Sequence, residues 1–384
     1  MIDTITLQIE RLDISDKNLQ FFKSSKIGSI TKYVFNPDTS LADYLPRITI
    51  KKVDGLSGQY TESTDIEFST PKILHNTNYY GIEEPNKNQF TDALFDKLCY
   101  IFKGSPFSKE TIDIANIKNI AFAFNFILPV NYAYPIEFLK IIPFLDIGKN
   151  YDKRKDTYYT ESDRFGFCGR IYNKQVSWKM YDKGAEIIAN AKNKTEKETA
   201  LKLKHGELPD KIIRMEITYQ NRYTLKRHLA TRLGGNNKQE RQLKDVFNNK
   251  LCQSILLESF DKIANELNIR AMDTPIFPIH EYFRKTKQAK MPIYDAYAWL
   301  GRCLSTQQTG SFQLKLISDE FYTRQDRFRA DKKMRDLLTK YSLPSFTLKQ
   351  VFDECRKQLV EFKIMKPEDF VKKDLAILQE SGIM

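Results

Sequence analysis

The stretch Ile213-Arg214-Met215-Glu216-Ile217-Thr218-Tyr219 alternates apolar and polar side chains without a break. Successive side chains of a β-strand point to opposite faces of a sheet, so the apolar residues form one buried face and Arg214 and Glu216 project together from the other. A strand with one apolar and one polar face is typical of an antiparallel sheet that is covered on one side. The stretch therefore predicts the class of fold.

The strand pattern that precedes it along the chain lies at 175–182. Its apolar series includes Trp178, which leaves Lys179 and Tyr181 together on the polar face. In this interpretation a tyrosine shares a surface with a cation.

Two earlier patterns add an acid and an amide. In 65–69 Glu67 points outward, and in 120–128 three phenylalanines form one face while Asn125 stands on the other. One sheet could bring these polar faces together. Further strand patterns lie at 4–9, 47–51 and 164–171.

Helical spacing of apolar residues occurs at 89–102, and 185–204 is rich in alanine, lysine and glutamate. We therefore predict an α+β fold, in which an antiparallel sheet carries helices on one face and a helical C-terminal domain follows.

A turn-rich stretch, Leu233-Gly234-Gly235-Asn236-Asn237, predicts the boundary between residues 1–233 and 238–384. Beyond it the strand signal fades and amphipathic segments at 251–268 and 324–341 dominate. The second of these is rich in arginine and lysine, which makes the C-terminal domain a candidate for DNA binding, although its interspersed acids fit a solvated helix face equally well.

The chain of 384 residues has 61 lysines and arginines against 49 acids, a net charge of +12. A positive surplus favours polyanionic partners, nucleic acid first among them. Well-solvated lysines would give the same composition, so the motifs must decide.

Five cysteines without a C-x-x-C pair argue against a disulfide framework and a structural zinc site, and fit a reducing cytoplasm. The apolar region 120–145 is interrupted by prolines and polar residues, so we expect buried core and no membrane partner. The first residues lack a signal-peptide pattern.

No phosphate-binding G-x-x-x-x-G-K-[ST] loop is present, so ATP-driven activity is not indicated. A tyrosine near carboxylates that bind a divalent cation could instead cut a phosphodiester, because a phenolate can attack phosphorus. Lys179, Lys183 or Arg214 could stabilise the developing charge. Polar sheet faces are ordinarily just solvated, so this hypothesis needs support from the order of the motifs.

Four segments of the chain resemble, in their order, the gene II/gene X family of filamentous-phage replication proteins and related plasmid rolling-circle initiators. These segments are Met1-Ile2-Asp3, Ile66-Glu67-Phe68-Ser69-Thr70-Pro71-Lys72-Ile73-Leu74-His75-Asn76-Thr77-Asn78, Met180-Tyr181-Asp182-Lys183-Gly184-Ala185-Glu186 and Ile213-Arg214-Met215-Glu216-Ile217. The resemblance covers roughly the first 230 residues, the size of one large domain.

The resemblance implies that Tyr181 is a nucleophile, that Lys183 is its cationic neighbour, and that Glu67 is a metal ligand. It also implies a site-specific nicking endonuclease of a phage or plasmid, which leaves a 5′-phosphotyrosine and a free 3′-OH for rolling-circle replication. The implied partners are the double-stranded origin and its exposed single strand, with a host polymerase and helicase; the oligomeric state is left open. Lys72, Lys179, Arg214 and Glu216 are expected to contact phosphate or support the site.

The sequence departs from the family at Asn125, where relatives usually carry an aspartate. An amide oxygen can ligate a hard cation but brings no charge, so we expect weakened binding of Mg²⁺ or Mn²⁺ and better binding by Asn125→Asp. The sequence also lacks the H-x-H motif that the wider superfamily carries on one strand. His75 is the one histidine within a matched segment, so it is a third candidate ligand of the metal ion.

Two other functions stay open. The chain could be a non-catalytic origin-binding or repressor protein on the same fold, with metal binding lost through Asn125. A less favoured alternative is an RNA-binding module.

Overall fold

The fold is given by a computed structural model of the chain. It describes residues 1–10, 14–38, 43–55, 58–104, 107–128, 139, 152–159, 165–209, 211–219, 222–236, 240–266, 275–276, 283, 286–298 and 346–367.

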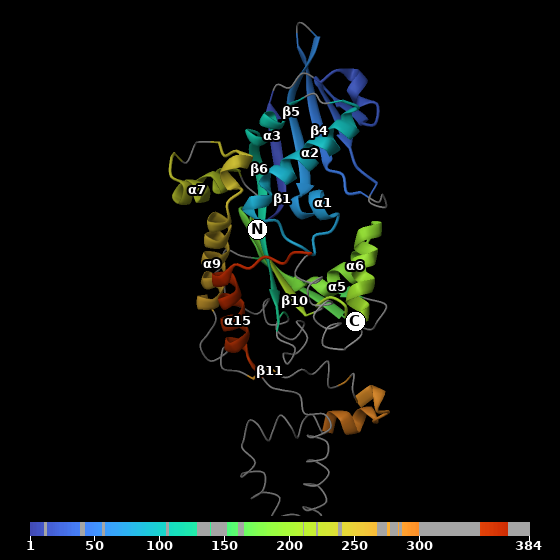
Figure 1. The fold of residues 1–384 in the computed structure, drawn as a ribbon, viewed down its shortest axis with the longest axis vertical. Helices are drawn as coiled ribbons and strands as arrows, with labels where there is room; N and C mark the ends of the chain where they lie inside the picture. The colour runs from blue at the N-terminus through green and yellow to red at the C-terminus, as the bar shows by residue number, and fades with distance from the viewer. Residues whose placement is uncertain are drawn as a thin grey trace, which may run out of the picture.

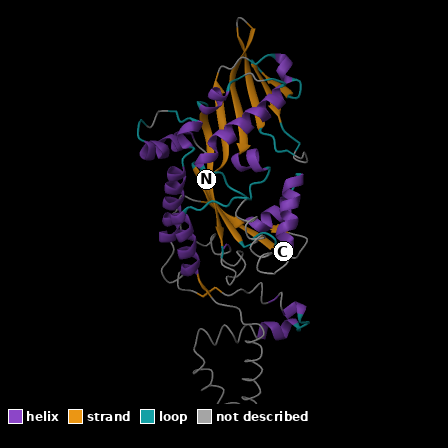
Figure 2. Ribbon diagram, viewed as in Figure 1, coloured by secondary structure: helices purple, strands orange, loops and turns teal. Residues whose placement is uncertain are grey.

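A ten-stranded sheet with the order β2-β3-β4-β5-β1-β6-β10-β9-β8-β7 is the centre of the described structure (Figures 1 and 2). Each pair of neighbouring strands in it is antiparallel. Its strands are β1 (Ile2–Glu10), β2 (Lys23–Ile27), β3 (Ile30–Phe35), β4 (Arg47–Gly55), β5 (Gly58–Ser69), β6 (Asn116–Ile127), β7 (Asp152–Tyr159), β8 (Phe165–Tyr172), β9 (Val176–Asp182) and β10 (Ile212–Tyr219).

The helices of the described residues are mostly short and flank this sheet. They are α1 (Thr70–His75), α2 (Lys87–Phe102), α3 (Lys109–Asp113), α5 (Lys183–Asn190), α6 (Lys194–His205), α7 (Arg222–Leu233), α8 (Leu243–Val246), α9 (Asn249–Glu266) and α15 (Leu348–Glu361). Two 3-10 turns, η1 (Asp16–Leu19) and η2 (Glu84–Asn86), and a two-stranded sheet of β11 (Pro275–Ile276) and β12 (Phe346–Thr347) complete the description.

The α+β class and the antiparallel sheet are confirmed. The predicted strand phases hold as well: Ile213, Met215 and Ile217 of β10 lie in the main hydrophobic cluster, together with Trp178 and Met180 of β9. The apolar residues of α2 and α9 cover this face, and ring contacts such as Phe126–Phe260 at 5.9 Å join sheet to helix. Burial of this face is the main stabilising contribution to the fold.

A second, smaller cluster forms at the other side of β10. Ile212, one residue out of phase with the main core, packs with Ile187 of α5, Leu203 of α6 and Tyr79. The segment around Tyr79 and the α5–α6 pair thereby lie next to the polar face, close to where β10 begins.

The sequence predicted one helix over 185–204, and the structure corrects this to two. After α5 the chain is extended up to Asn193, which is the N-cap of α6. The Asn193 side chain accepts a hydrogen bond from the Glu196 amide, and the Glu196 side chain accepts one from the Asn193 amide. This capping box starts a new helix. Strands β2, β3 and β7 were not predicted either. All five residues of β2 are exposed, so it carries no apolar alternation.

The predicted boundary at 233–237 separates α7 from α8, with Gly234 and Gly235 at positive φ. Leu256 of α9 and Phe352 of α15 nevertheless belong to the same cluster as the sheet. These helices therefore extend the core of the sheet, and a separate C-terminal domain stays a prediction. The basic segment at 324–341 lies outside the described residues. Among those that are described, no helix combines the length and apolarity that crossing a bilayer requires.

Candidate functional site

Strand register places the predicted polar residues side by side on the polar face of the sheet. Arg214 of β10 lies opposite Asn125 of β6 on one side and opposite Tyr181 of β9 on the other. Two residues along, Glu216 lies opposite Lys179. Strand register thus brings together five of the nine residues singled out from the sequence, and Lys183 joins them from the start of α5.

Arg214 is the centre of this group. Its side chain is 0% exposed, and its guanidinium lies 2.5 Å from Asp3 Oδ1 and donates to Glu216 Oε1 (3.0 Å) and Asn125 Oδ1 (3.0 Å). It also donates to the Asn78 carbonyl (3.1 Å). Burial works against the charge, but the negative groups around it outweigh this and raise the pKa of Arg214. A buried arginine is tolerated here because Nε and Nη1 donate hydrogen bonds and Nη2 is ion-paired with Asp3.

Glu216 accepts two hydrogen bonds at Oε1, from the Tyr181 hydroxyl (2.5 Å) and from Arg214. Its Oε2 lies 3.6 Å from Lys179 Nζ. Burial would raise the pKa of Glu216, but Arg214 and Lys179 outweigh it and lower this pKa to about 2. The carboxylate is therefore ionised throughout the neutral range.

Tyr181 is only 6% exposed. Burial, with the adjacent Glu216 carboxylate second, raises its pKa well above the ordinary value of a phenol. A carboxylate with a pKa near 2 is a poor base for such a phenol, so Glu216 fixes the direction of the hydroxyl in this arrangement and does not deprotonate it. Arg214 acts in the opposite direction and would stabilise a phenolate once formed.

Lys183 begins α5 directly after the strand that carries Tyr181. Asp182 caps this helix, with Oδ1 accepting from the Ala185 amide at 2.9 Å, which fixes the first turn and the position of Lys183. Lys183 Nζ donates to Asn78 Oδ1 and Glu186 Oε2, both at 2.7 Å, and lies 5.8 Å from the centre of the Tyr181 ring.

Because burial lowers the pKa of Lys183, its ammonium gives up a proton more readily than a surface lysine does. The structure therefore places Lys183, the cationic neighbour expected from the sequence, over the ring of Tyr181 and next to the hydrogen-bond network of the Tyr181 hydroxyl.

Asn125 is fully engaged within this network. Its Nδ2 donates to the Tyr79 carbonyl (2.9 Å), and its Oδ1 accepts from Arg214. Metal ligation by this oxygen would require loss of the Arg214 bond and would set a cation against a guanidinium. The geometry does not fit Asn125 as a ligand, although it explains why an amide occupies the position: one donor and one acceptor are both needed.

We expect Asn125→Asp to lower the free energy of unfolding by about 1–3 kcal/mol, because a carboxylate cannot donate to the Tyr79 carbonyl and would face its oxygen. Asn173→Asp is the matched control: Asn173 Oδ1 accepts from the amides of Gln175 and Val176, which a carboxylate does equally well. Urea unfolding of both variants measures the effect. Equal stability of Asn125→Asp and the wild type would contradict the bonding described for Asn125.

The other predicted residues lie farther toward β5 and α1. Glu67 is half exposed, with a carboxylate oxygen 3.9 Å from Arg47. Lys72 pairs with Glu196 at 2.6 Å, and the His75 ring lies 5.9 Å from that of Tyr80.

A cleft of about 240 Å³ connects the two regions across the open face. It is lined by Asp3, Glu67, Lys179 and Glu216, among others, but neither by His75 nor by Asn125. Within the described part of the chain, no cluster of three His, Cys, Asp or Glu side chains is arranged to hold a metal ion. The predicted set of Glu67, Asn125 and His75 therefore does not form one donor group, and the requirement for Mg²⁺ or Mn²⁺ stays a prediction.

Two partners of the network were not assigned a role from the sequence. Asp3 belongs to the first matched segment, and a register shift of β1 between Ile2 and Thr4 brings its carboxylate beneath Arg214. The sequence signal that could have identified Asp3 is its position as an acid at the start of an alternating strand. Asn78, the last residue of the second matched segment, joins Lys183 to Arg214 through its side chain and its carbonyl.

The fold and this site together define an α+β protein whose antiparallel sheet buries a tyrosine–carboxylate–arginine network on its polar face. No family model and no curated protein matches the chain. Among solved structures, a rolling circle replication initiator protein from Geobacillus stearothermophilus is similar, with a TM-score of 0.32 and 10% identity over 68% of this chain and 84% of that one. A likeness of this size does not assign a function, so the function is argued below from this chain's own residues.

Proposed function

We propose that this chain is a replication initiator that nicks one strand of DNA through Tyr181. The observation that carries the proposal is the bond of the Tyr181 hydroxyl to Glu216 at 2.5 Å, within reach of three cationic side chains and beside the open cleft. The order of the matched sequence segments supports the same assignment.

In the proposed reaction Tyr181 Oη attacks the scissile phosphorus and gives its proton to water. The bond between phosphorus and the 3′ oxygen breaks, and that oxygen leaves and takes a proton from water to become a 3′-OH, while the 5′ phosphate stays on the tyrosine, so no net proton is gained or lost. One phosphoester replaces another, so the step is reversible without ATP. Lys179, Lys183 and Arg214 supply positive charge next to the oxygens that become more negative.

The burial of Tyr181 sets a condition on this chemistry. At 6% exposure its hydroxyl is not open to a strand of DNA, so neighbouring groups must move before attack. Lys179 is 34% exposed and ion-paired to Glu216. Movement of Lys179 toward a DNA phosphate would expose Glu216 and the Tyr181 hydroxyl on this side.

The deciding experiment incubates the purified chain with supercoiled DNA that contains its gene and flanking sequence, with Mg²⁺, with Mn²⁺ and with EDTA. The proposal expects relaxed DNA and a covalent adduct at Tyr181, mapped by mass spectrometry. Intact supercoiled DNA in all three conditions would refute it.

The same burial favours one alternative, a non-catalytic DNA-binding protein on this fold. In that case Tyr181 is a structural member of the ion network, and the chain binds the origin without cutting it. Binding without any cleavage or adduct in the experiment above would support this function.

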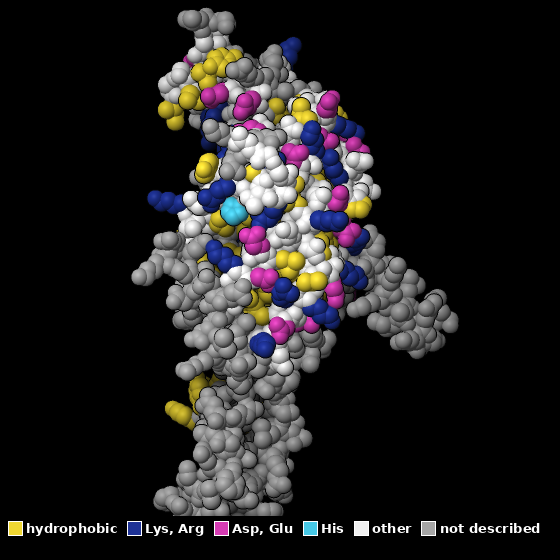
Figure 3. All heavy atoms as spheres, turned by 90° about the vertical axis from the view of Figure 1, so that its left-hand side faces the viewer, with side chains coloured by type: hydrophobic (Ala, Val, Ile, Leu, Met, Phe, Trp, Pro, Cys, Tyr) yellow, Lys and Arg dark blue, Asp and Glu magenta, His cyan; other side chains and the backbone are white. Residues whose placement is uncertain are grey.

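We expect binding of DNA to weaken at least about tenfold between roughly 50 and 200 mM salt, because phosphate contacts release counterions. The net charge of +12 motivates this prediction. On the side of the molecule where Figure 1 places α7 and α9, Figure 3 shows Lys and Arg interspersed with Asp and Glu, so the surplus is not concentrated there. A flat salt response in fluorescence anisotropy would contradict phosphate contacts.

We expect Glu67→Ala to reduce cleavage at least about tenfold while changing the free energy of unfolding by less than about 1 kcal/mol. The side chain is 51% exposed and its ion pair with Arg47 is long, so little stability depends on it. The cleft position supports a role in cleavage. Glu62→Ala, an exposed acid of the same strand, is the control. A loss of stability that matches the loss of cleavage would mark Glu67 as structural.

A further inference from the structure

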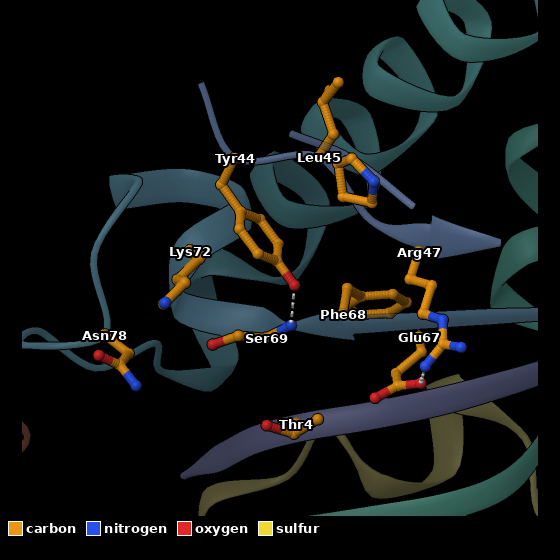
Figure 4. A pocket seen from close by; sticks show the side chains of 10 residues that line it. Thr4, Tyr44, Leu45, Arg47, Glu67, Phe68, Ser69, Lys72 and Asn78 are labelled. Atoms are coloured by element: carbon orange, nitrogen blue, oxygen red, sulfur yellow. Dashed lines mark hydrogen bonds and ion pairs between the residues drawn. The ribbon is translucent and has the colours of Figure 1, made fainter. Parts of the chain in front are cut away.

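A second cavity adjoins the cleft, and Thr4 and Glu67 line both. It has a volume of about 240 Å³ and lies between β5, α1 and the segment around Tyr44 (Figure 4). This is below the roughly 300–1,000 Å³ of pockets that enclose drug-sized ligands, so it suits one phosphate group with its adjoining sugar.

Ser69 is the residue that points to a ligand. It precedes α1 as its N-cap, a position where serine usually accepts a hydrogen bond from the helix, but it makes no such bond. Its hydroxyl is buried, with no hydrogen-bond partner among the described residues, while its amide donates to the Tyr44 hydroxyl at 2.8 Å. Figure 4 shows the Ser69 oxygen directed to the side of Lys72 and Asn78. A buried hydroxyl without a partner costs free energy unless something else binds it.

The remaining walls are rich in donors. Lys72 and Arg47 bring positive charge. Asn78 Oδ1 accepts a hydrogen bond from Lys183, whereas Asn78 Nδ2 has no acceptor among the described residues. Two acids oppose these cations: Glu67 faces Arg47 at the half-exposed rim, and Glu196 is ion-paired with Lys72 at 2.6 Å, so a phosphate would share Lys72 with Glu196.

We propose that this cavity binds a phosphodiester of the DNA strand next to the one that Tyr181 attacks, with Ser69, Lys72 and Asn78 as its donors. The identity of the ligand as DNA rests on the proposed function; the donor geometry does not. Because Asn78 also accepts a hydrogen bond from Lys183, and Lys183 lies over the Tyr181 ring, a phosphate in this cavity is connected to the nucleophile through two side chains, those of Asn78 and Lys183.

Ser69→Ala tests the proposal without changing charge. We expect the variant to bind a short, fluorescein-labelled single-stranded DNA about tenfold more weakly at fixed low salt, since one hydrogen bond to a charged group is lost. Its melting temperature should be unchanged or higher, because the hydroxyl has no partner in the free protein. Binding is measured in the Tyr181→Phe background, so that cleavage does not interfere.

Thr64→Val is the matched control. Thr64 lies on the same strand, is 0% exposed and has a hydroxyl that likewise has no partner in the described structure, but it pairs with Ile9 and Ile50 on the apolar face. It should bind the DNA as tightly as the wild type.

Inorganic phosphate and thymidine monophosphate, used as competitors, separate a strand from a free nucleotide. We expect both to compete far more weakly than unlabelled DNA. Undiminished binding by Ser69→Ala, a marked drop in its melting temperature, or competition by the monophosphate as strong as by DNA would each overturn the proposal. Weakened binding in a protein that never nicks would refute the proposed function and leave this site standing.

Discussion

Replacing Tyr181 by phenylalanine should reduce nicking by at least about a thousandfold and abolish covalent capture of DNA, because the variant lacks the oxygen that attacks phosphorus in the proposed reaction. Binding of DNA should stay within about twofold of the wild type. The ring stays in place between Lys183 and the sheet, so the expected loss is chemical. Gel analysis of nicked DNA and mass spectrometry of the adduct provide the measurements.

Tyr219→Phe is the control for Tyr181→Phe. Tyr219 is also a buried tyrosine of the central strands, but it belongs to the apolar cluster and its ring contacts that of Phe122. Its loss should leave nicking unchanged. An adduct that maps to a tyrosine other than Tyr181, or nicking that survives Tyr181→Phe, would contradict the assignment.

The face of each strand could be predicted because alternation with a period of two is local. Arg214, Glu216, Lys179 and Tyr181 share the polar face as the sequence indicated. The order of strands could not be predicted in this way. That β10 lies between β6 and β9, which makes Asn125 a neighbour of Arg214, depends on contacts between distant segments.

Burial was the other quantity that the sequence could not supply. A polar face of an antiparallel sheet is usually solvated, yet Arg214 and Lys183 are fully buried here, because the segment with Asn78 and Tyr79 crosses above them and supplies carbonyl and amide oxygens. Nothing in the local pattern of 76–82 indicates this path. The burial of this network changes the interpretation of Asn125 from a weak metal ligand to a side chain that hydrogen-bonds the Tyr79 carbonyl and Arg214.

Arg214→Leu should lower the free energy of unfolding at pH 7 by about 3–5 kcal/mol, the typical result of removing one partner of a buried ion pair. The substitution leaves the Asp3 and Glu216 carboxylates in the protein interior without their guanidinium, and the Asn125 and Asn78 oxygens without their donor. Arg47→Leu is the control, because that arginine is half exposed and its long ion pair should contribute less than about 1 kcal/mol.

The pH dependence of the same variant distinguishes lost charge pairing from lost packing. In the wild type the pKa of Glu216 is lowered to about 2 in the folded state, so its stabilising contribution is complete above the ordinary carboxyl pKa and is lost as the pH falls toward 2. In Arg214→Leu the pKa of Glu216 should instead be raised by burial, and the pKa of Asp3, which burial already raises in the wild type against the effect of Arg214, should rise further. The folded variant should therefore gain stability from protonation as the pH falls. The difference in unfolding free energy between the two proteins should therefore be largest near pH 7 and shrink by pH 4, measured by urea unfolding at both values. A difference that is constant with pH would show that Arg214 acts mainly by filling space, and that the network around Tyr181 is not held by charge.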